Sequence, residues 1–406
     1  MSGNGVSAFG RYVRPSADHG QDARAAEGAN GPNQVGRILA IADDLTGAAE
    51  IAGIGWRCGL PARVARQPMR QSAAGLTVLD TDSRLLNAAE SARTVEELLN
   101  GVSAADFQRA YKKTDSVLRG HIVDELAAAM SALKLKAALL VAQNPSRGRI
   151  IRDGRYLIDG VPLDRTTFGQ DPDHPARTAD VAALLGGLVR CIAPGQPLLD
   201  GINVGEAWTV EHVRQWAGRV EGSILPAGGA DFFTAILEHR GLSACRAAVQ
   251  RLEEPVLFAC GSASSHSREL AADAQRRGMP ICPMPDAVFA GGTTDRWAED
   301  VAYALKHAGR ALMTIPQPVD RSPGASQRIQ SAMAAAVLRV LEDCAVANLL
   351  LEGGATASAV CRRMAWHELD VIGELSPGVV QMQSAGGQRL VLKPGSYPWP
   401  ECVWRD

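Results

Sequence analysis

The sequence has no apolar run as long as the roughly 18 residues that a membrane-spanning helix requires, and no charged segment followed by an apolar stretch opens it. We therefore expect no membrane partner and a cytoplasmic location. Net charge is also low, because 42 Lys and Arg residues against 44 Asp and Glu residues leave −2, and the basic residues are scattered. Since no basic block would gather a polyanion, we expect no nucleic-acid partner.

Metal and dinucleotide patterns are missing as well. The eight cysteines form no C-x-x-C pair and have no ligand spacing to histidine, so we expect reduced thiols and no metal held by protein ligands. Neither a G-x-x-x-x-G-K-[ST] loop nor a dinucleotide fingerprint occurs. Gly53 and Gly55 do not form such a fingerprint, because they fall inside a helical pattern and not at a strand end.

The length predicts two domains, because 406 residues exceed the size at which a single hydrophobic core stops growing. Residues 1–36 are rich in Gly, Ala, Asn and Ser and contain almost no large aliphatic residue, so we predict a disordered tail. A helical stretch and a polar segment around 240–254 then divide the remainder. We expect an N-terminal domain over 37–240 and a C-terminal domain over 255–406.

Short apolar runs alternate with helix-like segments in both parts of the chain. This alternation predicts an α/β fold with two domains, each a mostly parallel sheet flanked by helices. The predicted strands lie at 38–42, 62–65, 76–80 and 137–142 in the first part, and at 255–261, 311–315 and 348–354 in the second.

Charged side chains crowd four predicted strand ends in the first domain. In parallel sheets, ligands bind beyond the carboxyl ends of the strands, so these side chains should converge. An Arg fork suits a carboxylate, and an Asp can accept the proton of a hydroxyl, which together predict a site for a small polyhydroxy acid. The residues are Asp43 and Asp44; Asp82, Ser83 and Arg84; Lys113, Asp115, Ser116 and Arg119; and Arg149.

Helix capping is the competing explanation for these strand ends. Asp and Ser after a strand commonly cap the next helix, and Arg commonly covers its surface. Capping accounts well for Thr46 or Ser116, but not for two adjacent aspartates or for an Arg at three of the four ends.

Eight strings between about residues 37 and 396 resemble, in identity and in order, the four-carbon acid sugar kinases. They are IADDLTGA, TDSR, KKTDSVLRG, NPSRGR, DGRYLIDGVPLDRTTFGQDP, GSASS, LEGGATAS and PGVV with LVLKPG. The resemblance implies an ATP-dependent kinase that phosphorylates a hydroxyl of threonate, erythronate or 3-oxo-tetronate. It also implies that the N-terminal domain binds the small-molecule sugar acid and the C-terminal domain binds ATP with Mg²⁺.

Individual roles follow from the same resemblance. Asp43, Asp44 and Asp115 are the candidates for hydroxyl binding and for the catalytic base, with no choice among them. The three arginines are the candidates to bind the substrate carboxylate. The full set of substrate-binding residues is Asp82, Ser83, Arg84, Lys113, Ser116, Arg119 and Arg149.

Two glycine turns in the second domain are the candidate nucleotide contacts. Each follows a strand and opens a helix, where free backbone N–H groups favour a phosphate. A tight turn with no ligand would look the same, and the resemblance is what favours function. The implied nucleotide-binding residues are Gly261, Ser262, Gly353, Gly354, Ala355, Thr356, Lys393 and Gly395.

The chain departs from the family pattern at two points. Ala355 stands where the family has an acidic residue, and the closing loop, residues 393–398, reads KPGSYP where the family has KSGGFG. Because proline removes N–H donors, phosphoryl transfer could be impaired, leaving a sugar-acid-binding protein as the alternative. An oxidoreductase of doubly wound fold is disfavoured by the missing glycine fingerprint. The sequence leaves the oligomeric state open, and a homo-oligomer is allowed.

Overall fold

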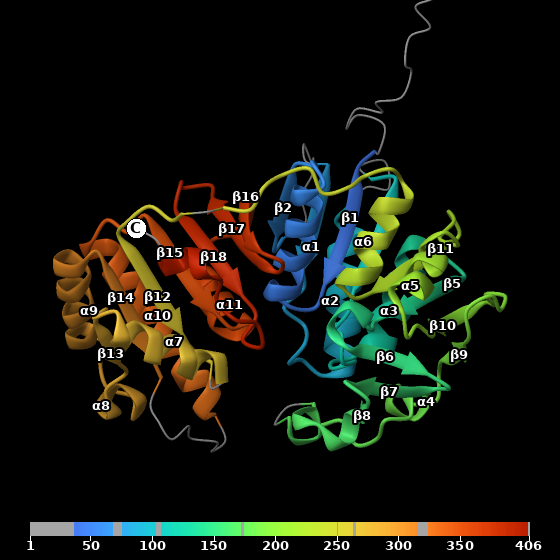
Figure 1. Cartoon of the computed structure of the whole chain (residues 1–406), viewed down its shortest axis with the longest axis horizontal. Helices are drawn as coiled ribbons and strands as arrows, with labels where there is room; N and C mark the ends of the chain where they lie inside the picture. The colour runs from blue at the N-terminus through green and yellow to red at the C-terminus, as the bar shows by residue number, and fades with distance from the viewer. Residues whose placement is uncertain are drawn as a thin grey trace, which may run out of the picture. The chain divides into compact units, whose positions relative to one another are not determined.

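The computed structural model describes residues 36–67, 75–102, 107–171, 174–249, 251–262, 265–315 and 324–404. The predicted tail over 1–36 therefore lies outside the described residues, apart from Gly36. Strands and helices alternate along the described chain (Figure 1), which confirms the predicted α/β class with mostly parallel strands.

The N-terminal half, residues 36–240, contains eight parallel strands in the order β2-β3-β1-β4-β11-β5-β10-β9. They are β1 (Ile38–Ala42), β2 (Ala62–Ala65), β3 (Leu76–Asp80), β4 (Arg109–Lys113), β5 (Ala137–Val141), β9 (Arg190–Ile192), β10 (Gly201–Gly205) and β11 (Ile224–Gly228). A separate small sheet holds β6 (Arg149–Arg152), β7 (Arg155–Ile158) and β8 (Val161–Pro162). The helices are α1 (Leu45–Arg57), α2 (Ala88–Asn100), α3 (Ile122–Leu133), α4 (Val181–Leu184), α5 (Val210–Ala217) and α6 (Ala230–His239).

The C-terminal half, residues 251–404, places five parallel strands beside an antiparallel pair, in the order β13-β14-β12-β15-β18-β17-β16. The strands are β12 (Val256–Cys260), β13 (Ile281–Pro283), β14 (Arg310–Thr314), β15 (Asn348–Glu352), β16 (Glu368–Ser376), β17 (Val379–Ser384) and β18 (Arg389–Lys393). The helices are α7 (Ser265–Arg276), α8 (Asp286–Phe289), α9 (Asp295–Ala308), α10 (Ala325–Asp343) and α11 (Gly354–Arg363).

The two groups of strands meet at an antiparallel pair formed by β16 and β2, so that they belong to one 15-stranded sheet. Leu369 lies opposite Val64, and beside them Arg63 donates to both carboxylate oxygens of Asp370, at 2.5 and 2.9 Å. This pairing was not part of the sequence prediction, because a half-buried strand such as β16 carries no local sign of which edge it joins.

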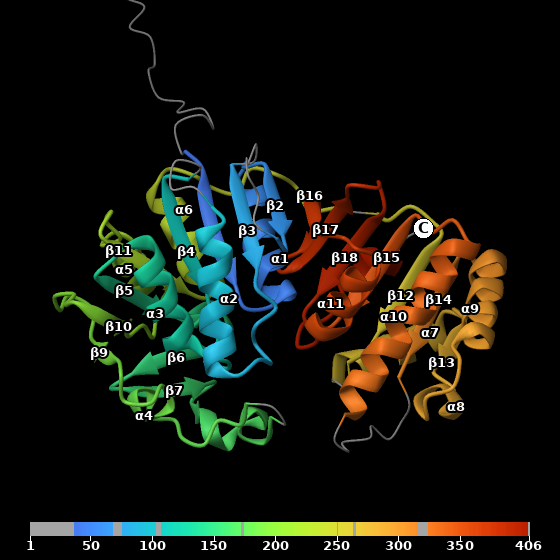
Figure 2. The same cartoon turned by 180° about the vertical axis from the view of Figure 1, so that it is seen from behind.

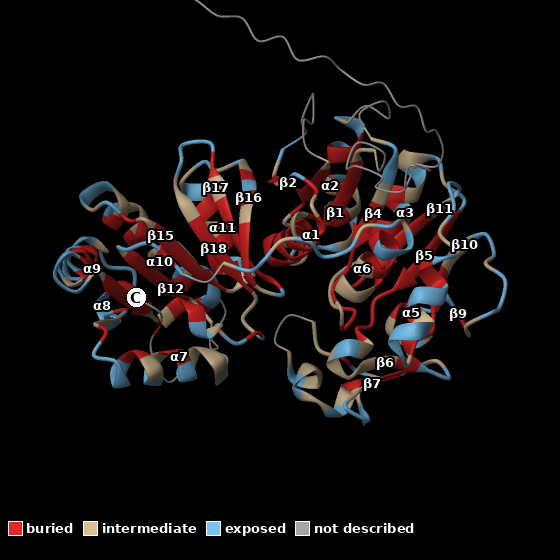
Figure 3. Cartoon of the chain, turned by 45° about the horizontal axis from the view of Figure 1, so that its top comes forward, coloured by how far each residue is buried: buried red, intermediate tan, exposed pale blue. Residues whose placement is uncertain are grey.

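Helix α1 packs between the two halves. Its Gly53 is required by a close approach, since a Cβ there would lie 2.6 Å from Val380 Cγ2 on β17. Helices α2 and α3 cover the face of the N-terminal sheet that is opposite to α1 (Figure 2). The strands of this sheet that lie between α1 on one face and α2 and α3 on the other are buried (Figure 3). Because α1 contacts both halves, it connects the strand ends of the N-terminal half with the strands of the C-terminal half.

Candidate functional site

The carboxyl ends of β1, β3 and β4 lie next to one another. Ala42, the last residue of β1, pairs with Asp80 of β3 on one side and with Lys113 of β4 on the other. The residues that follow these strands therefore leave the sheet together, as the sequence predicts for parallel strands. Asp43 and Arg84 are brought into contact in this way: Nε and Nη2 of Arg84 donate to the two oxygens of Asp43 at 2.7 and 2.9 Å.

A second Arg–carboxylate fork lies beside the first. Nε and Nη2 of Arg119 donate to the two oxygens of Asp115 at 3.0 and 2.9 Å, and Nη1 donates to Asp171 at 3.1 Å. Arg84 connects the two forks, since its Nη1 lies 3.9 Å from Asp115. Four of the predicted site residues thus form one buried, charged cluster.

These arginines set the ionisation of the two aspartates. Burial opposes the charged form of Asp115, but Arg119 and Arg84 outweigh it and hold its pKa well below the usual range. Burial likewise opposes ionisation of Asp43, and the charges of Arg84 and Lys112 still lower its pKa. Both carboxylates are therefore ionised and have both oxygens engaged, which makes each a poor proton acceptor.

Asp44 is placed differently. One carboxylate oxygen caps α1 by accepting from Gly47 N at 3.0 Å and lies 2.9 Å from Arg84 Nη2. The other oxygen accepts from Thr46 Oγ1 at 2.5 Å. A Cβ at Gly354, the first residue of α11, would lie 2.9 Å from this second oxygen. Capping is thus part of the explanation, as the competing interpretation allowed, and the same carboxylate also faces the C-terminal half.

Arg149, at the start of β6, differs from the other two arginines. Its Nη1 donates to Ser116 Oγ, and its guanidinium lies 5.7 Å from the ring centre of Phe168, which Arg119 also covers at 5.6 Å. Within the described residues, Arg149 forms no ion pair with a carboxylate. Among the described residues, Arg149 therefore contacts neutral groups, and no carboxylate compensates its positive charge.

Lys113 is buried at the end of β4. Its Nζ donates to Thr114 O at 2.9 Å and lies 3.5 Å from Glu50 Oε2 on α1. A Cβ at Gly47 would lie 3.5 Å from this Nζ and 2.7 Å from Asp44 Oδ1. Lys113 and Asp44 therefore approach the same backbone position at the start of α1.

Two predicted substrate residues lie apart from this cluster. Ser83 is fully buried, and its hydroxyl donates to Glu125 at 2.5 Å, within a network that also holds Lys112. Asp82 has a φ of 50° and accepts hydrogen bonds from Arg66, Ser358 and Arg362, the last two on α11. In this structure Ser83 supports the strand ends, and Asp82 connects the halves.

At the predicted nucleotide-binding site, the glycines allow the backbone to approach neighbouring segments closely. A Cβ at Gly261 would overlap Thr356 Oγ1 at the start of α11, and Gly353 has a φ of 92°, a conformation that favours glycine. Gly395 approaches Ser262, because a Cβ there would lie 2.8 Å from Ser262 Oγ. Ala355 is exposed beside these residues.

Lys393 is the exception among the predicted nucleotide contacts. Its side chain is 0% exposed and its Nζ lies 3.4 Å from Glu352, which Trp399 Nε1 also contacts at 2.8 Å. Nζ further donates to the carbonyl oxygens of Pro394 and Tyr397 at 3.0 and 2.6 Å. Burial lowers the pKa of Lys393 against the opposing charge of Glu352. In this conformation the Lys393 ammonium holds the closing loop and lies beside Glu352.

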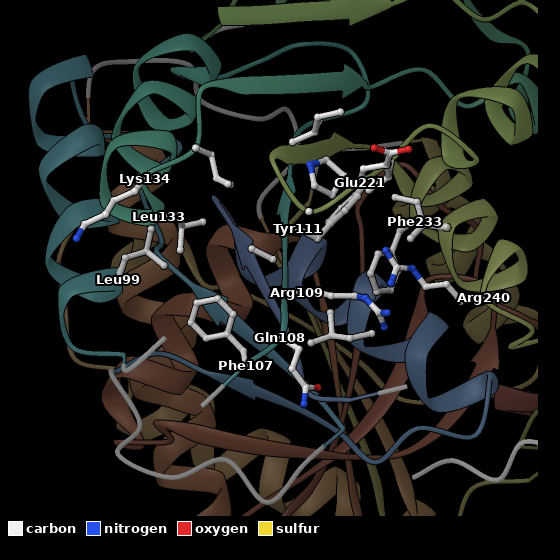
Figure 4. Close-up of a pocket in the computed structure, with 18 of the residues that line it drawn as sticks. Leu99, Phe107, Gln108, Arg109, Tyr111, Leu133, Lys134, Glu221, Phe233 and Arg240 are labelled. Atoms are coloured by element: carbon white, nitrogen blue, oxygen red, sulfur yellow. The ribbon is translucent and has the colours of Figure 1, made fainter. Parts of the chain in front are cut away.

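A cavity of about 680 Å³ lies at the opposite edge of the N-terminal sheet (Figure 4). Its walls include Ile38, Arg109 and Ile224, the first residues of β1, β4 and β11. Leu99, Phe107 and Leu133 supply much of its apolar surface, but none of the predicted site residues lines it. Because catalytic groups of parallel sheets gather at the carboxyl ends, we do not assign the reaction to this cavity.

Sequence reasoning missed several residues of the site. Glu50 lies inside an amphipathic helix, where a buried carboxylate gives no local signal. Phe168 occurs in a string that resembles the family, and an aromatic residue between two arginine-rich segments could have been noted. Arg66 follows β2 and donates to Asp80 and Asp82 at 3.0 and 2.8 Å, a role that only the arrangement of β2 and β3 reveals.

In the part of the chain that the structure describes, no group of three or more His, Cys, Asp or Glu side chains is arranged to hold a metal ion. No described helix is both long and apolar enough to cross a membrane.

Two family models match the chain. The model of a sugar-binding N-terminal domain matches residues 38–193, and the model of a nucleotide-binding C-terminal domain matches residues 257–397. The first range contains the charged strand ends, and the second contains the glycine turns.

Curated relatives match over most of the chain. A D-threonate kinase of Bordetella bronchiseptica is 28% identical over 88% of this chain and 93% of its own length. A D-threonate kinase of Salmonella typhimurium is 26% identical over 84% of this chain and 89% of its own length. Further relatives are named D-erythronate kinase and 3-oxo-tetronate kinase. A crystal structure of a Salmonella typhimurium protein, provisionally described as a tRNA synthase, shares the fold with a TM-score of 0.73 at 19% identity, covering 90% of this chain and 97% of that one.

Proposed function

This chain belongs to the four-carbon acid sugar kinase family, and from that premise we propose that it transfers the γ-phosphoryl group of ATP to a hydroxyl of a threonate-, erythronate- or 3-oxo-tetronate-type acid. We assign the sugar acid to the N-terminal domain over 37–240 and the nucleotide to the C-terminal domain over 255–406. The sugar-acid-binding protein without transferase activity is not favoured, because the relatives are named as kinases.

The observation that carries this proposal is the approach of Asp44 to Gly354. Asp44 follows a strand of the sugar-binding half, and Gly354 opens the helix of the nucleotide-binding half. Free N–H groups at the start of α11 favour a phosphate. A sugar hydroxyl beside Asp44 and a γ-phosphate beside Gly354 would then be neighbours, as phosphoryl transfer requires.

We assign the substrate carboxylate first to Arg149. Arg84 and Arg119 already hold aspartates bidentately, whereas Arg149 contacts the neutral Ser116 and Phe168. A carboxylate beside Arg149 would gain a charge-assisted hydrogen bond without displacing an ion pair. The hydroxyls of the acid would then extend toward Asp115, Asp43 and Asp44.

Asp44 is our candidate for the catalytic base. In the transfer, the sugar oxygen bonds to the γ-phosphorus while the bond from that phosphorus to the β–γ bridging oxygen breaks. The hydroxyl proton passes to the Asp44 carboxylate. Asp43 and Asp115 are less suited, because a bidentate arginine fork holds both oxygens of each and their pKa values are lowered. Asp44 contacts Arg84 through one oxygen alone, and its other oxygen accepts from the neutral Thr46 hydroxyl and faces Gly354.

Backbone groups would supply most of the nucleotide contacts. The turns at Gly261–Ser262 and Gly353–Gly354 allow the close approach that a polyphosphate needs, and Thr356 and Gly395 border them. When bound with ATP, Mg²⁺ would neutralise the charge of the phosphates. Glu352 is occupied by Lys393 and Trp399, so we assign the ligands of Mg²⁺ to phosphate oxygens and water, which this ion commonly retains.

ADP release from Mg-ATP in the presence of C4 and C5 sugar acids tests the proposal. We expect phosphorylation of one or a few C4 acids and a product that carries one added phosphoryl group by mass spectrometry. Calorimetry with Mg-ATP, with and without the acid, checks nucleotide binding. No turnover with any acid and no heat up to millimolar nucleotide would contradict the kinase assignment. A cytoplasmic location and a homo-oligomeric state stay predictions, which fractionation and light scattering would test.

A further inference from the structure

Tyr397 of the closing loop reaches across to helix α1. Its hydroxyl donates to Glu50 Oε1 at 2.6 Å, and both residues are buried, with exposed fractions of 9% and 6%. Burial and the charge of Glu50 raise the pKa of Tyr397, so the hydroxyl keeps its proton and remains a donor. A residue of the nucleotide-binding half is thus tied to the helix that carries Asp44 at its start.

The second oxygen of Glu50 continues this contact toward the sugar-acid site. It lies 3.5 Å from Lys113 Nζ, and Lys113 is itself only 4% exposed. Lys113 and Asp44 approach the same position at Gly47. Tyr397, Glu50 and Lys113 therefore form a chain of polar contacts that ends where the two substrates would meet.

The closing loop holds Tyr397 from its other side. Lys393 Nζ donates to Tyr397 O at 2.6 Å, and Tyr397 N donates to Pro394 O at 3.1 Å. The guanidinium of Arg147 lies 4.0 Å from the centre of the Tyr397 ring. Because its backbone, ring and hydroxyl are all fixed, Tyr397 can transmit the position of the loop to Glu50.

We propose that Tyr397 is a positioning residue for phosphoryl transfer, which acts through Glu50 to hold the Lys113 ammonium beside Asp44 at the transferred phosphoryl group. This inference rests on the proposed kinase function. The family pattern has Phe at this position, which has no hydroxyl, so the contact belongs to this chain's variant of the loop. The departure from the family pattern at residues 393–398 would thereby supply a positioning contact and would not merely weaken a nucleotide-binding loop.

The expected effect falls on the chemical step. Without the hydroxyl, Glu50 loses a fixed donor and the Lys113 ammonium is less well held, and small displacements of reacting groups cost rate. Arg149 and the glycine turns are untouched, so substrate binding should change little. Tyr397→Phe should lower kcat and the single-turnover rate about tenfold, which is about 1.4 kcal/mol in the barrier, and change KM for the acid and for ATP less than about twofold.

A matched control separates positioning from stability. Tyr111→Phe removes another buried hydroxyl, which donates to Gly229 O at 2.8 Å, next to the start of α6. It should lower the melting temperature about as much as Tyr397→Phe and leave kcat unchanged. If Tyr397→Phe lowers only the melting temperature, Tyr397 is structural and the inference is wrong.

Glu50→Gln provides an independent test, should Tyr397→Phe fold poorly. Because Tyr397 acts through Glu50, the double variant should be no slower than Glu50→Gln alone. Additive losses in kcat would overturn the inference. Wild-type protein that turns over no sugar acid would instead contradict the proposed function, whereas an active wild type with equally active Tyr397→Phe would contradict only the role of Tyr397.

Discussion

At the strand ends of the N-terminal half, charged side chains pair with one another, whereas at those of the C-terminal half, glycines bring backbone segments together. Arg84 with Asp43 and Arg119 with Asp115 form a preorganised polar cluster before any ligand arrives. At the other end, a Cβ at Gly261 would overlap Thr356 Oγ1, and Gly353 adopts a φ of 92° that favours glycine. In the proposed function, the first site would recognise its ligand by side-chain charge, and the second by access to backbone N–H groups.

Because of this difference, removing a charged side chain has different consequences in the two halves. A charge removed from the N-terminal cluster leaves its partner buried and unpaired, which affects both binding and stability. The buried cation at the end of β18, Lys393, is already neutralised by Glu352, and its carbonyl oxygen accepts from Gly353 N at 2.9 Å. The departure from the family in the closing loop therefore changes the contacts of that loop more than it removes a phosphate ligand.

The largest expected effect is at Asp44, where the two sites meet. Asp44→Asn should lower kcat by about 10² to 10⁴, the range for loss of a general base. The melting temperature should hold, because Asn also caps helices well. Steady-state kinetics and thermal unfolding measure the two effects. A change in kcat below about threefold would transfer the role of base to Asp43 or Asp115.

Lys393→Met should destabilise the fold by about 3 kcal/mol, because it leaves Glu352 buried without its cation. Urea unfolding measures this loss, and adding Glu352→Gln should recover much of it. KM for ATP should stay within about twofold of wild type, since we place no phosphate on Lys393. A raised KM with unchanged stability would show that Lys393 contacts the nucleotide and would remove the contrast between the halves.

Arg149→Ala should weaken binding of the sugar acid by about 2 kcal/mol, within the range for a hydrogen bond to a charged group. Stability should change little, because Arg149 contacts neutral groups. Arg119→Ala is the comparison, since it should also lower the melting temperature by removing the bidentate fork on Asp115 and the ion pair with Asp171. Calorimetry with the acid and thermal unfolding distinguish the two arginines. Equal destabilisation by both variants would argue against Arg149 as the arginine that binds the substrate carboxylate.

The smallest expected effect is a pH dependence at Asp80, beneath the contact between the halves. Burial raises its pKa to about 7, against the opposing charge of Arg66. The folded state therefore binds this proton more tightly than the unfolded state, so its contribution is present at low pH and is lost as pH rises toward 7. Arg66 lies 3.0 Å from Asp80 and already opposes this rise in pKa, so we expect the loss to fall mainly between about pH 5 and 7.

Unfolding titrations of wild type and Asp80→Asn at several pH values measure this contribution. The variant should show a flatter pH dependence between pH 5 and 7.5. Below about pH 4, both proteins should lose stability, because protonation then removes the contributions of Asp43 and Asp115, whose pKa values are lowered. Identical slopes for the two proteins above pH 5 would mean that Asp80 is ionised in the folded state.

The sequence by itself determined the parallel strands and the residues at their ends. Apolar runs such as 38–42 and 76–80 are local, and a strand end in a parallel sheet has its place as soon as the strand exists. The grouping of Asp43, Arg84 and Asp115 could therefore be predicted, and so could the glycine turns at 261 and 353.

Only the tertiary structure decided which groups these residues contact. Asp82 meets Ser358 across 276 residues of chain, and Tyr397 meets Glu50 across 347. Periodicity tells which side of an element is buried but not which element covers it, so neither contact has a local sign. For the same reason, the burial of Lys393 against Glu352 and the pairing of β16 with β2 could be decided only by the packing of the whole chain.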